Sequence, residues 1–321
     1  MLTGKQLILA TKPFAKEDRV KSWFLTLSTL FILIALLVGT VYNFHWSLKL
    51  LCSIGAGLVI VRLFVIYHDH QHKAILEKSP LANAIFTVFG FYVLAPPGIW
   101  SASHDYHHKH NSKLFSASIG SYPIYTKQKF EKSPKSEQRH YLFIRHPLTI
   151  IFGYFFTFMY GMCIKSIINR LSKNIDSLVG LILHIVYQVC VFYFLGWQTW
   201  IFLCAIPHFI SGGLGSYLFY AQHNFPTVTF AGNEEWTYEG AALDSSSYMN
   251  LIPPLRWATA NIGYHHIHHM NSRIPFYRLP EVMEAIPELQ HPKETSLKPK
   301  DVLACFKLKV WDFEKQKMVG L

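Results

Sequence analysis

Two long apolar runs lie near the start of the chain, at residues 23–42 and 48–67, and the first contains no charged residue. The hydrocarbon core of a bilayer is ~30 Å thick and a helix needs ~20 apolar residues to cross it, so each run predicts a transmembrane helix. The connection 43–47 carries no Lys, Arg, Asp or Glu, which is typical of a loop on the non-cytoplasmic side. The second helix would therefore return the chain to the side of its N-terminus.

Two further apolar runs, residues 177–195 and 198–220, predict a second pair of transmembrane helices. Only Gly196 and Trp197 separate them. Because this link is short and uncharged, we expect a tight turn on the far side of the membrane, with aromatic residues at the interface.

Two shorter apolar runs are expected to enter the membrane without crossing it. Residues 82–99 are interrupted by Pro96 and Pro97, and proline ends a helix, which favours a re-entrant or interfacial segment. Residues 147–164 are followed by basic residues, which favour the cytoplasmic side; these are Lys165, Arg170 and Lys173.

The polar segments complete the predicted organisation. Residues 1–22 are basic, and we expect a cytoplasmic leader with little structure of its own, followed by a single domain over residues 23–321. Residues 100–146 and 221–321 are expected to form a helical cap on the cytoplasmic side. The prediction is an all-α integral-membrane protein with four transmembrane helices, one or two re-entrant or interfacial segments, and both termini in the cytoplasm.

The composition agrees with a membrane protein. Hydrophobic residues make up 51% of the chain and charged residues 15%, whereas typical soluble domains have about 25% charged residues. The formal net charge of +11 suits contact with anionic headgroups at the cytoplasmic face. We do not predict nucleic-acid binding, because the sequence has no cluster of interleaved basic and aromatic residues. The five cysteines include no CxxC pair and predict neither a disulfide framework nor a thiolate metal site.

Histidines are concentrated just outside the apolar runs. His104, His107 and His108 have the spacing i, i+3, i+4, and His265, His268 and His269 repeat it. Residues three and four apart share one face of a helix, and imidazole is the commonest metal ligand in proteins. The nine candidate ligands also include an i, i+4 pair and one histidine after the last apolar run; they are His68, His72, His104, His107, His108, His223, His265, His268 and His269.

This number of ligands suits two ions better than one, because a structural zinc site uses four protein ligands and a catalytic site three. Imidazoles without thiolates leave zinc, copper, iron and nickel possible. Four crossings with two partial insertions put all three histidine stretches on the cytoplasmic side, so the topology and the metal site support each other.

Other histidines are left out of the predicted site. His70 lies two residues from both His68 and His72, so on a helix it points away from them, and His110 and His266 are excluded for similar reasons. His184 and His208 lie inside predicted transmembrane helices, and we expect hydrogen bonds between helices for them.

Four acidic residues near the histidines are candidate partners of the ligands. A metal-bound histidine usually donates its second N–H to a carboxylate or a carbonyl. Asp69 and Asp105 each follow the first histidine of a stretch, and Glu239 and Asp244 lie between His223 and the last stretch.

These histidine stretches resemble the boxes of membrane fatty acid desaturases. Residues 68–72, HDHQH, are similar to the HDxxH first box, and residues 104–108, HDYHH, are similar to the HxxHH second box. Residues 261–269, NIGYHHIHH, with SRIP at 272–275, look like the third box and flank of acyl-lipid desaturases. Two further segments are similar to that subfamily, LFYAQHNF at 218–225 and RHP at 145–147. The resemblance covers about residues 50–312.

The resemblance implies a non-haem di-iron centre, in which the boxes hold two Fe ions at the cytoplasmic face of the membrane. Such enzymes use O2 as co-substrate and two electrons to remove two hydrogens from an acyl chain and form a cis double bond. The implied substrate is a saturated or partly unsaturated acyl chain of a lipid, bound in an apolar tunnel. The first box commonly has small residues where His70 and Gln71 stand, so iron ligation by His70 stays open.

The resemblance also implies a separate electron donor, ferredoxin-like or cytochrome b5-like, because the sequence contains no HPGG haem motif. The basic loops are suited to an acidic partner.

Two alternatives are weighed against a desaturase. A membrane hydroxylase or a carotenoid oxygenase uses the same boxes, but the flank of the third box favours the desaturase. A divalent-metal transporter predicts ionisable residues along the crossings, whereas the histidine stretches here lie just outside them.

Overall fold

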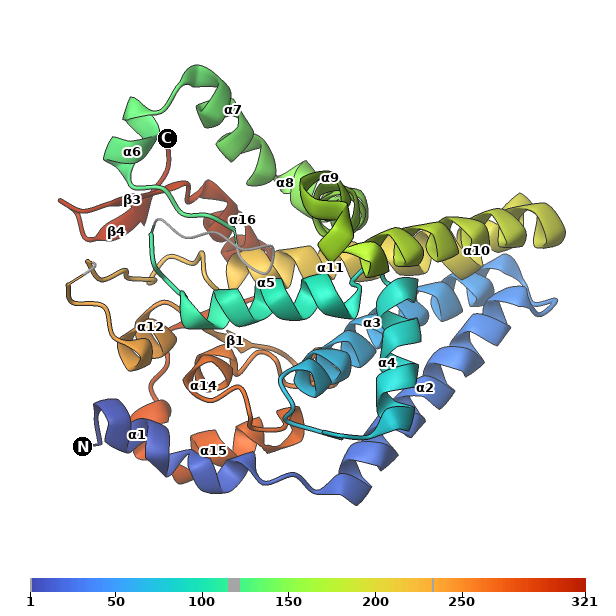
Figure 1. The fold of residues 1–321 in the computed structure, drawn as a ribbon, viewed down its shortest axis with the longest axis horizontal. Coiled ribbons are helices and arrows are strands. Elements are labelled where there is room, and N and C mark those ends of the chain that lie inside the picture. The colour runs from blue at the N-terminus through green and yellow to red at the C-terminus, as the bar shows by residue number, and fades with distance from the viewer. Residues whose placement is uncertain (1, 115–121, 233) are drawn as a thin grey trace.

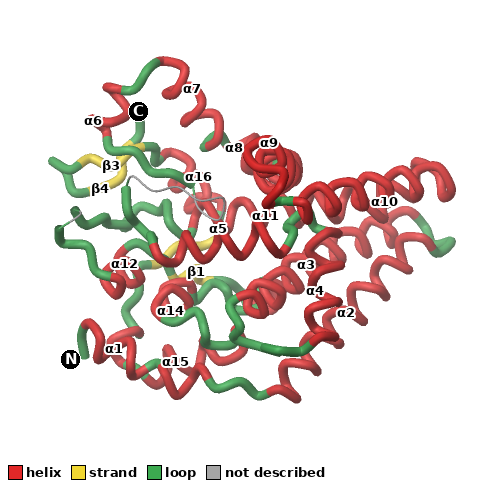
Figure 2. Tube along the Cα trace, viewed as in Figure 1, coloured by secondary structure: helices red, strands yellow, loops and turns green. Residues whose placement is uncertain are grey.

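The computed structural model describes residues 2–114, 122–232 and 234–321 and is mostly helical (Figures 1 and 2). Two segments are π-helical, Tyr154–Ile164 and Ile201–Ala205. The α-helices are α1 Gly4–Ala10, α2 Arg19–Val41, α3 Trp46–Gln71, α4 Pro80–Tyr92, α5 Pro97–Lys109, α6 Lys127–Lys132, α7 Lys135–Ile144, α8 Pro147–Ile151, α9 Lys165–Arg170, α10 Ile175–Trp200, α11 Ile206–Ala221, α12 Tyr238–Asp244, α13 Pro253–Ala258, α14 His265–Met270, α15 Leu279–Ala285 and α16 Pro299–Lys307.

Four short strands form two small pairs, both at the end of the molecule that carries the termini (Figure 2). Strand β1, Tyr248–Asn250, pairs in parallel with β2, Glu294–Ser296. Strand β3, Val310–Asp312, pairs antiparallel with β4, Lys317–Val319. The helical fold is confirmed, and these two pairs are what the all-α prediction omitted.

Among the residues that the structure describes, three stretches are long and apolar enough to cross a membrane: α2, α3 and the run Ile175–Ala221 that contains α10 and α11. The pair α4 and α5 is a fourth candidate, although its two helices are bent by 89°. Large apolar side chains on α2 and α10 point outward; Phe31 is 73% exposed and Phe194 is 74% exposed. An apolar outer face of this kind is suited to lipid. Helix α3 packs between α2 and α11.

The run Ile175–Ala221 folds back on itself at Gly196, whose φ of +82° lies in the region that favours glycine. His184 of α10 and His208 of α11 are 24 residues apart, which would separate them by ~36 Å along a straight helix. Their ring centroids are instead 5.0 Å apart. The two helices are therefore antiparallel neighbours, with the turn where the sequence predicts it.

The predicted insertion at residues 82–99 contains the break between α4 and α5. Ser79 caps α4 by accepting a hydrogen bond from Ala82 N–H, and Pro97 occupies the first turn of α5. The hydroxyl of Tyr67 donates to the carbonyl of Ala95 within the break, at 2.8 Å. This bond satisfies a backbone group that cannot be left unpaired in an apolar environment.

The N-terminal segment is structured, which corrects the expectation of a leader with little structure of its own. Leu7 of α1 is buried in one apolar cluster with Ile267 and Met270 of α14. Thr11 accepts a hydrogen bond from Asn271 at 3.0 Å, and Glu17 accepts one from the backbone N–H of Leu76 at 2.6 Å. The segment thus packs on the loops that follow two of the histidine stretches.

The predicted insertion at residues 147–164 consists of α8 and the first π-helical segment, and both contact α11. The described parts of segments 100–146 and 221–321 lie together at the left of Figure 1, away from the turn between α2 and α3. Helices α5 and α14 and the end of α3 meet there, and they carry the three histidine stretches.

Candidate metal centre

Nine buried histidines come together where four elements converge. His68 and His72 lie at the end of α3, three histidines lie on α5, three lie on α14, and His223 follows α11. None of the nine is more than 8% exposed. They form two groups whose ring nitrogens lie within 4.8 Å of one another, and each group could hold a metal ion. Cluster A is His68, His72, His104, His108 and His268, and cluster B is His107, His223, His265 and His269.

In cluster A four of the five Nε2 atoms form a connected set. Nε2 of His104 lies 2.7 Å from Nε2 of His68 and 3.1 Å from Nε2 of His108. Nε2 of His268 lies 3.0 Å from Nε2 of His108. Nε2 of His72 is buried and has no hydrogen-bond partner among the described residues.

In cluster B the four Nε2 atoms form a closed ring of contacts of 3.0–3.2 Å. A neutral imidazole nitrogen either donates one hydrogen or accepts one. At most two of these four contacts are therefore hydrogen bonds at any moment, and at least two short N···N contacts have no hydrogen bond of their own. A cation at the centre of the ring would accept a lone pair from all four nitrogens at once, so the residues present fit a bound metal.

Each three-histidine helix contributes to both clusters. On α5, His104 and His108 belong to cluster A and His107 to cluster B. On α14 the division is reversed, because His265 and His269 belong to cluster B and His268 to cluster A. In each cluster, the i, i+4 pair of one helix thus meets the i+3 histidine of the other helix. The two helices therefore link the two clusters rigidly.

His223 and the three cluster histidines of α14 have lowered pKa values, which favour the neutral imidazole. Burial lowers the pKa of His223 to about 4, although its bond to the Ser245 carbonyl acts in the opposite direction. Burial, followed by repulsion from neighbouring histidines, lowers the pKa of His265, His268 and His269 well below the ordinary value. A neutral imidazole is the form that binds a metal.

Two of the nine have a partner on the second nitrogen. Nδ1 of His223 donates to the carbonyl of Ser245 at 2.9 Å, which leaves the Nε2 lone pair for cluster B. Nδ1 of His68 lies 3.1 Å from Asp69, whose other carboxylate oxygen accepts from the backbone N–H of Phe276 at 2.6 Å. Asp69 is therefore placed as the sequence suggested.

The other three carboxylates contact no cluster histidine among the described residues, which corrects the expectation for them. Asp105 has an exposed side chain. Glu239 accepts a hydrogen bond from the backbone N–H of Gly4 at 2.5 Å, and Asp244 forms an ion pair with Lys293 at 2.8 Å. Asp105 follows His104 on a helix, so its side chain points about 100° away from that of its neighbour.

His70 points away from both clusters. Its Nε2 lies 2.8 Å from Oδ1 of Asn83, and its Nδ1 lies 3.2 Å from the carbonyl of Ile75. His266 is buried beside the carbonyl of Leu289, and neither His110 nor His266 is part of a cluster.

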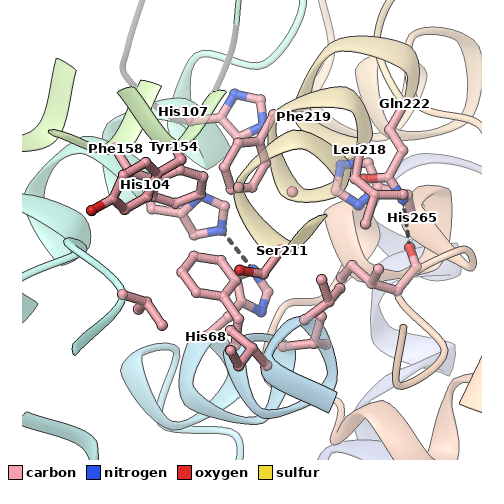
Figure 3. Close-up of a pocket in the computed structure, with 18 of the residues that line it drawn as sticks. His68, His104, His107, Tyr154, Phe158, Ser211, Leu218, Phe219, Gln222 and His265 are labelled. Carbon is pink, nitrogen blue, oxygen red and sulfur yellow. Dashed lines mark hydrogen bonds between the residues drawn. The ribbon is translucent and has the colours of Figure 1, made fainter. Parts of the chain in front are cut away.

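An apolar cavity extends from the clusters between α3, α11 and the segment Tyr154–Ile164 (Figure 3). Five histidines of the two clusters line one end; they are His68, His104, His107, His223 and His265. Figure 3 shows Tyr154 and Phe158 on one side of the cavity and Leu218 and Gln222 on the other. Gln222 and His208 both line it, and their separation on α11 corresponds to a length of ~21 Å.

Tyr154 and His208, which line the end of this cavity away from the clusters, are joined by hydrogen bonds to neighbouring helices. Nδ1 of His184 donates to the carbonyl of Tyr92 at 2.8 Å, and Nε2 of His184 lies 2.7 Å from the hydroxyl of Tyr154. Nε2 of His208 lies 3.2 Å from the same carbonyl. The expected hydrogen bonds between helices are therefore confirmed for both histidines. They satisfy the carbonyl at the end of α4, where no helical partner is available.

The family model for fatty acid desaturase matches residues 44–298, a range that contains all nine histidines. The chain belongs to the fatty acid desaturase family. The resemblance of its histidine boxes is thereby confirmed, and membership implies an oxidoreductase that acts on acyl lipids.

Individual desaturases are similar over much of the chain. A fatty acid desaturase of Bacillus subtilis (strain 168) is 27% identical over 320 residues, which cover 98% of this chain and 90% of that protein. An sn-1 acyl-lipid omega-3 desaturase (ferredoxin) of Nostoc sp. (strain 36) is 23% identical, over 72% of this chain and 65% of that protein. An sn-1 oleoyl-lipid 12-desaturase of Synechocystis sp. is 20% identical, over 81% of this chain and 74% of that protein.

Sequence reasoning did not identify two residues that line or support this desaturase site. The ring of Trp100 stacks on His104, with centroids 4.7 Å apart and planes at 13°. Trp100 precedes His104 by four residues on α5, and this helical spacing was a signal that could have found it. Tyr154 lines the cavity from a segment with no histidine box, and no local pattern indicated its position.

Proposed function

We propose that this protein is a membrane fatty acyl desaturase that introduces a cis double bond into an acyl chain of a lipid. The observation that carries the proposal is the apolar cavity whose end is lined by histidines of both clusters. An extended acyl chain in this cavity would lie against α3 and α11 with one part of its length beside the histidine nitrogens.

The nine histidines would hold two iron ions, one in each cluster. When bound, the ions would supply the oxidising power that cleavage of unactivated C–H bonds requires, since no amino-acid side chain provides it. Asp69 would orient His68, and the Ser245 carbonyl would orient His223, by fixing which nitrogen carries the proton. Stacking of the Trp100 ring on the ring of His104 would hold His104 in place.

The overall reaction balances as follows. The acyl chain gives up two hydrogens, that is, two electrons and two protons. An external donor supplies two more electrons, and two further protons come from solvent. Together these four electrons and four protons reduce one O2 to two waters. The protein's own contribution is to position the chain: Phe64, Phe158 and Phe219 line the cavity, where they exclude water from the reacting carbons.

The topology that suits this chemistry has four crossings, α2, α3, α10 and α11, with residues 82–99 and 147–164 inserted partway. Both termini and the cap would then be cytoplasmic, and the single domain of residues 23–321 would carry the site. The basic leader and the uncharged turns at 43–47 and 196–197 support this orientation.

The electron donor is proposed to be a separate small protein, ferredoxin-like or cytochrome b5-like. The name of the Nostoc relative includes ferredoxin, which supports the first of these. Positive charge in the cap suits an acidic carrier.

The experiment is the fatty acid profile of a host without desaturases, measured by gas chromatography–mass spectrometry with this chain and ferredoxin co-expressed. We expect a new unsaturated species that is absent with His268→Ala, while the variant is still found in the membrane fraction. His140→Ala, a substitution of an exposed histidine outside both clusters, should retain the product. A hydroxylated chain would favour the hydroxylase alternative, and no new species with the donor present would contradict the proposal.

A further inference from the structure

A second cavity reaches cluster B from the cap. Its lining includes His107 and His223 together with Asn111 and Lys113 of the segment after α5. The apolar cavity touches the same two histidines. Among the described residues, the second cavity is lined by no histidine of cluster A. Cluster B therefore has a polar approach that does not pass through the space proposed for the acyl chain.

A line of aromatic side chains joins this second cavity to the protein surface. Phe230 lines the cavity and packs against Trp311 of β3, with ring centroids 5.2 Å apart. The ring of Trp311 lies 6.3 Å from that of Phe313, which is 41% exposed. Trp311 is fully buried, and its backbone N–H donates to the carbonyl of Tyr125 at 2.9 Å. The three rings form a fixed contact path from the surface to the cavity.

The surface around Phe313 is basic. It is formed by residues 127–139, which contain α6, and by residues 307–317, which contain β3; we call these two segments the docking face. They hold nine Lys and Arg against four Asp and Glu. Glu137 accepts from the Tyr125 hydroxyl, Asp312 accepts from the backbone of Glu314, and Lys309 donates to the carbonyl of Arg145. These bonds leave the charges in place, so the excess of five basic side chains gives the face a net positive field.

The docking face lies at the far left of Figure 1, where β3, β4 and α6 are labelled, while the ends of α2 and α10 extend to the right. It is thus on the opposite side of the molecule from the apolar helices. Because this face lies away from the membrane-spanning helices, the headgroups of the surrounding membrane are not next to it. A soluble protein can reach it directly.

We infer that the docking face receives a reduced, acidic one-electron carrier protein, whose electrons pass along Phe313, Trp311 and Phe230 to cluster B. This inference rests on the proposed function. Each encounter oxidises one carrier by one electron, and two encounters supply the two donor electrons that complete the reduction of O2. Electron-transfer encounters bury little surface, so steering by charge matters more for them than a large apolar interface does.

The test measures binding by the full chain in phosphatidylcholine nanodiscs, with purified ferredoxin as the probe. The triple variant Lys127→Glu/Lys315→Glu/Lys317→Glu reverses exposed charges on the docking face. The control Lys5→Glu/Lys12→Glu/Lys16→Glu makes the same charge change on the N-terminal segment, where all three lysines are also exposed. We expect a Kd roughly tenfold weaker for the first variant at low salt, little change for the control, and loss of the difference at high salt.

An unchanged Kd for the docking-face variant would overturn the inference. It would favour other anions, such as lipid headgroups, as the ligands of this face. Equal weakening by both variants would also overturn it, since the effect would then be one of net charge. These results are independent of the fatty acid profile, so failure of the proposed function and failure of the docking site are distinguishable.

A second measurement tests the aromatic path. In iron-loaded protein, Phe230→Leu should slow the oxidation of reduced ferredoxin, followed by stopped-flow absorbance, and leave the Kd for ferredoxin unchanged. Phe143→Leu, at an exposed phenylalanine outside the path, is the matched control. An unaltered rate with Phe230→Leu would overturn the assigned path.

Discussion

Nη2 of Arg145 donates a hydrogen bond to Oδ1 of Asn224 at 2.5 Å, and Asn224 directly follows His223 of cluster B. The guanidinium is fully buried, and its Nη1 donates to the carbonyl of Pro123 at 2.9 Å. It lies 5.3 Å from the ring of Tyr141 and 5.0 Å from that of Tyr220. A buried cation held by neutral oxygens and aromatic faces thus ties the end of α7 to the turn that carries His223.

Arg145→Ala is expected to destabilise the protein. The substitution removes two charge-assisted hydrogen bonds, and each such bond contributes about 1.5–3 kcal/mol. We expect a lower thermal midpoint in detergent and a lower iron content, because the position of His223 depends on Asn224. Arg139→Ala, which alters an exposed arginine on α7, is the control. Equal thermal midpoints for the two variants would contradict the role of Arg145.

Asp69 and Asp105 offer a matched pair, because each follows the first histidine of its stretch. Asp69→Asn should weaken the interaction with Nδ1 of His68 that orients its ring. We expect metal affinity or activity to fall by ~10–100-fold, which is typical when the partner of a metal-bound histidine is lost. Asp105→Asn should change neither by more than about twofold, since its side chain is exposed. Metal per protein, measured by inductively coupled plasma mass spectrometry after dialysis against graded chelator, checks both. Similar losses for the two variants would mean that Asp105 also supports the site.

The comparison of these two aspartates shows what the sequence could not predict. The spacing of each histidine stretch is local, so the shared helical faces of His104, His107 and His108 follow from periodicity alone. Which carboxylate turns inward depends on contacts made by distant segments. Asp69 is fixed by the backbone N–H of Phe276, which is 207 residues away in the chain. The same limit applies to the division of each box between clusters A and B.

The apolar runs and the turn at Gly196 were predictable because length and hydrophobicity are properties of short segments. The folded N-terminal segment was not, since its apolar run at residues 7–10 is short and the partners of Leu7 in its buried cluster come from distant parts of the chain. Tyr154 and Trp311 likewise gain their positions only from tertiary packing.

His72 and His70 test which histidine of the first box is a ligand. His72→Ala should remove one ligand of cluster A and lower the bound iron, because its Nε2 faces the cluster. His70→Ala should retain iron and lose stability by about 1–3 kcal/mol, since Asn83 and the Ile75 carbonyl lose their buried partner. Iron content and thermal midpoint, measured together on both variants, separate the two outcomes. Loss of iron with His70→Ala alone would reverse the assignment.

Tyr154 is expected to influence where the double bond forms. Its side chain lines the deep end of the apolar cavity, and its hydroxyl lies 2.7 Å from Nε2 of His184. If the methyl end of the acyl chain rests against this ring, Tyr154→Ala would let the chain move further in. The carbons beside the histidine clusters would then lie farther from the methyl end. We therefore expect the double bond to shift toward the carboxyl end, or longer acyl chains to be accepted.

Tyr154→Phe separates the volume of the ring from its hydrogen bond. The phenylalanine keeps the ring that limits the cavity, while Nε2 of His184 retains Gln188 as a neighbour at 3.2 Å. We expect the position of the double bond to be unchanged in this variant and to move only in Tyr154→Ala. Double-bond positions are read from dimethyl disulfide adducts of the fatty acids by mass spectrometry. If the position stays the same in both variants while the amount of product is retained, the chain must be placed from its headgroup end, because a deeper cavity would then leave the reacting carbons where they were.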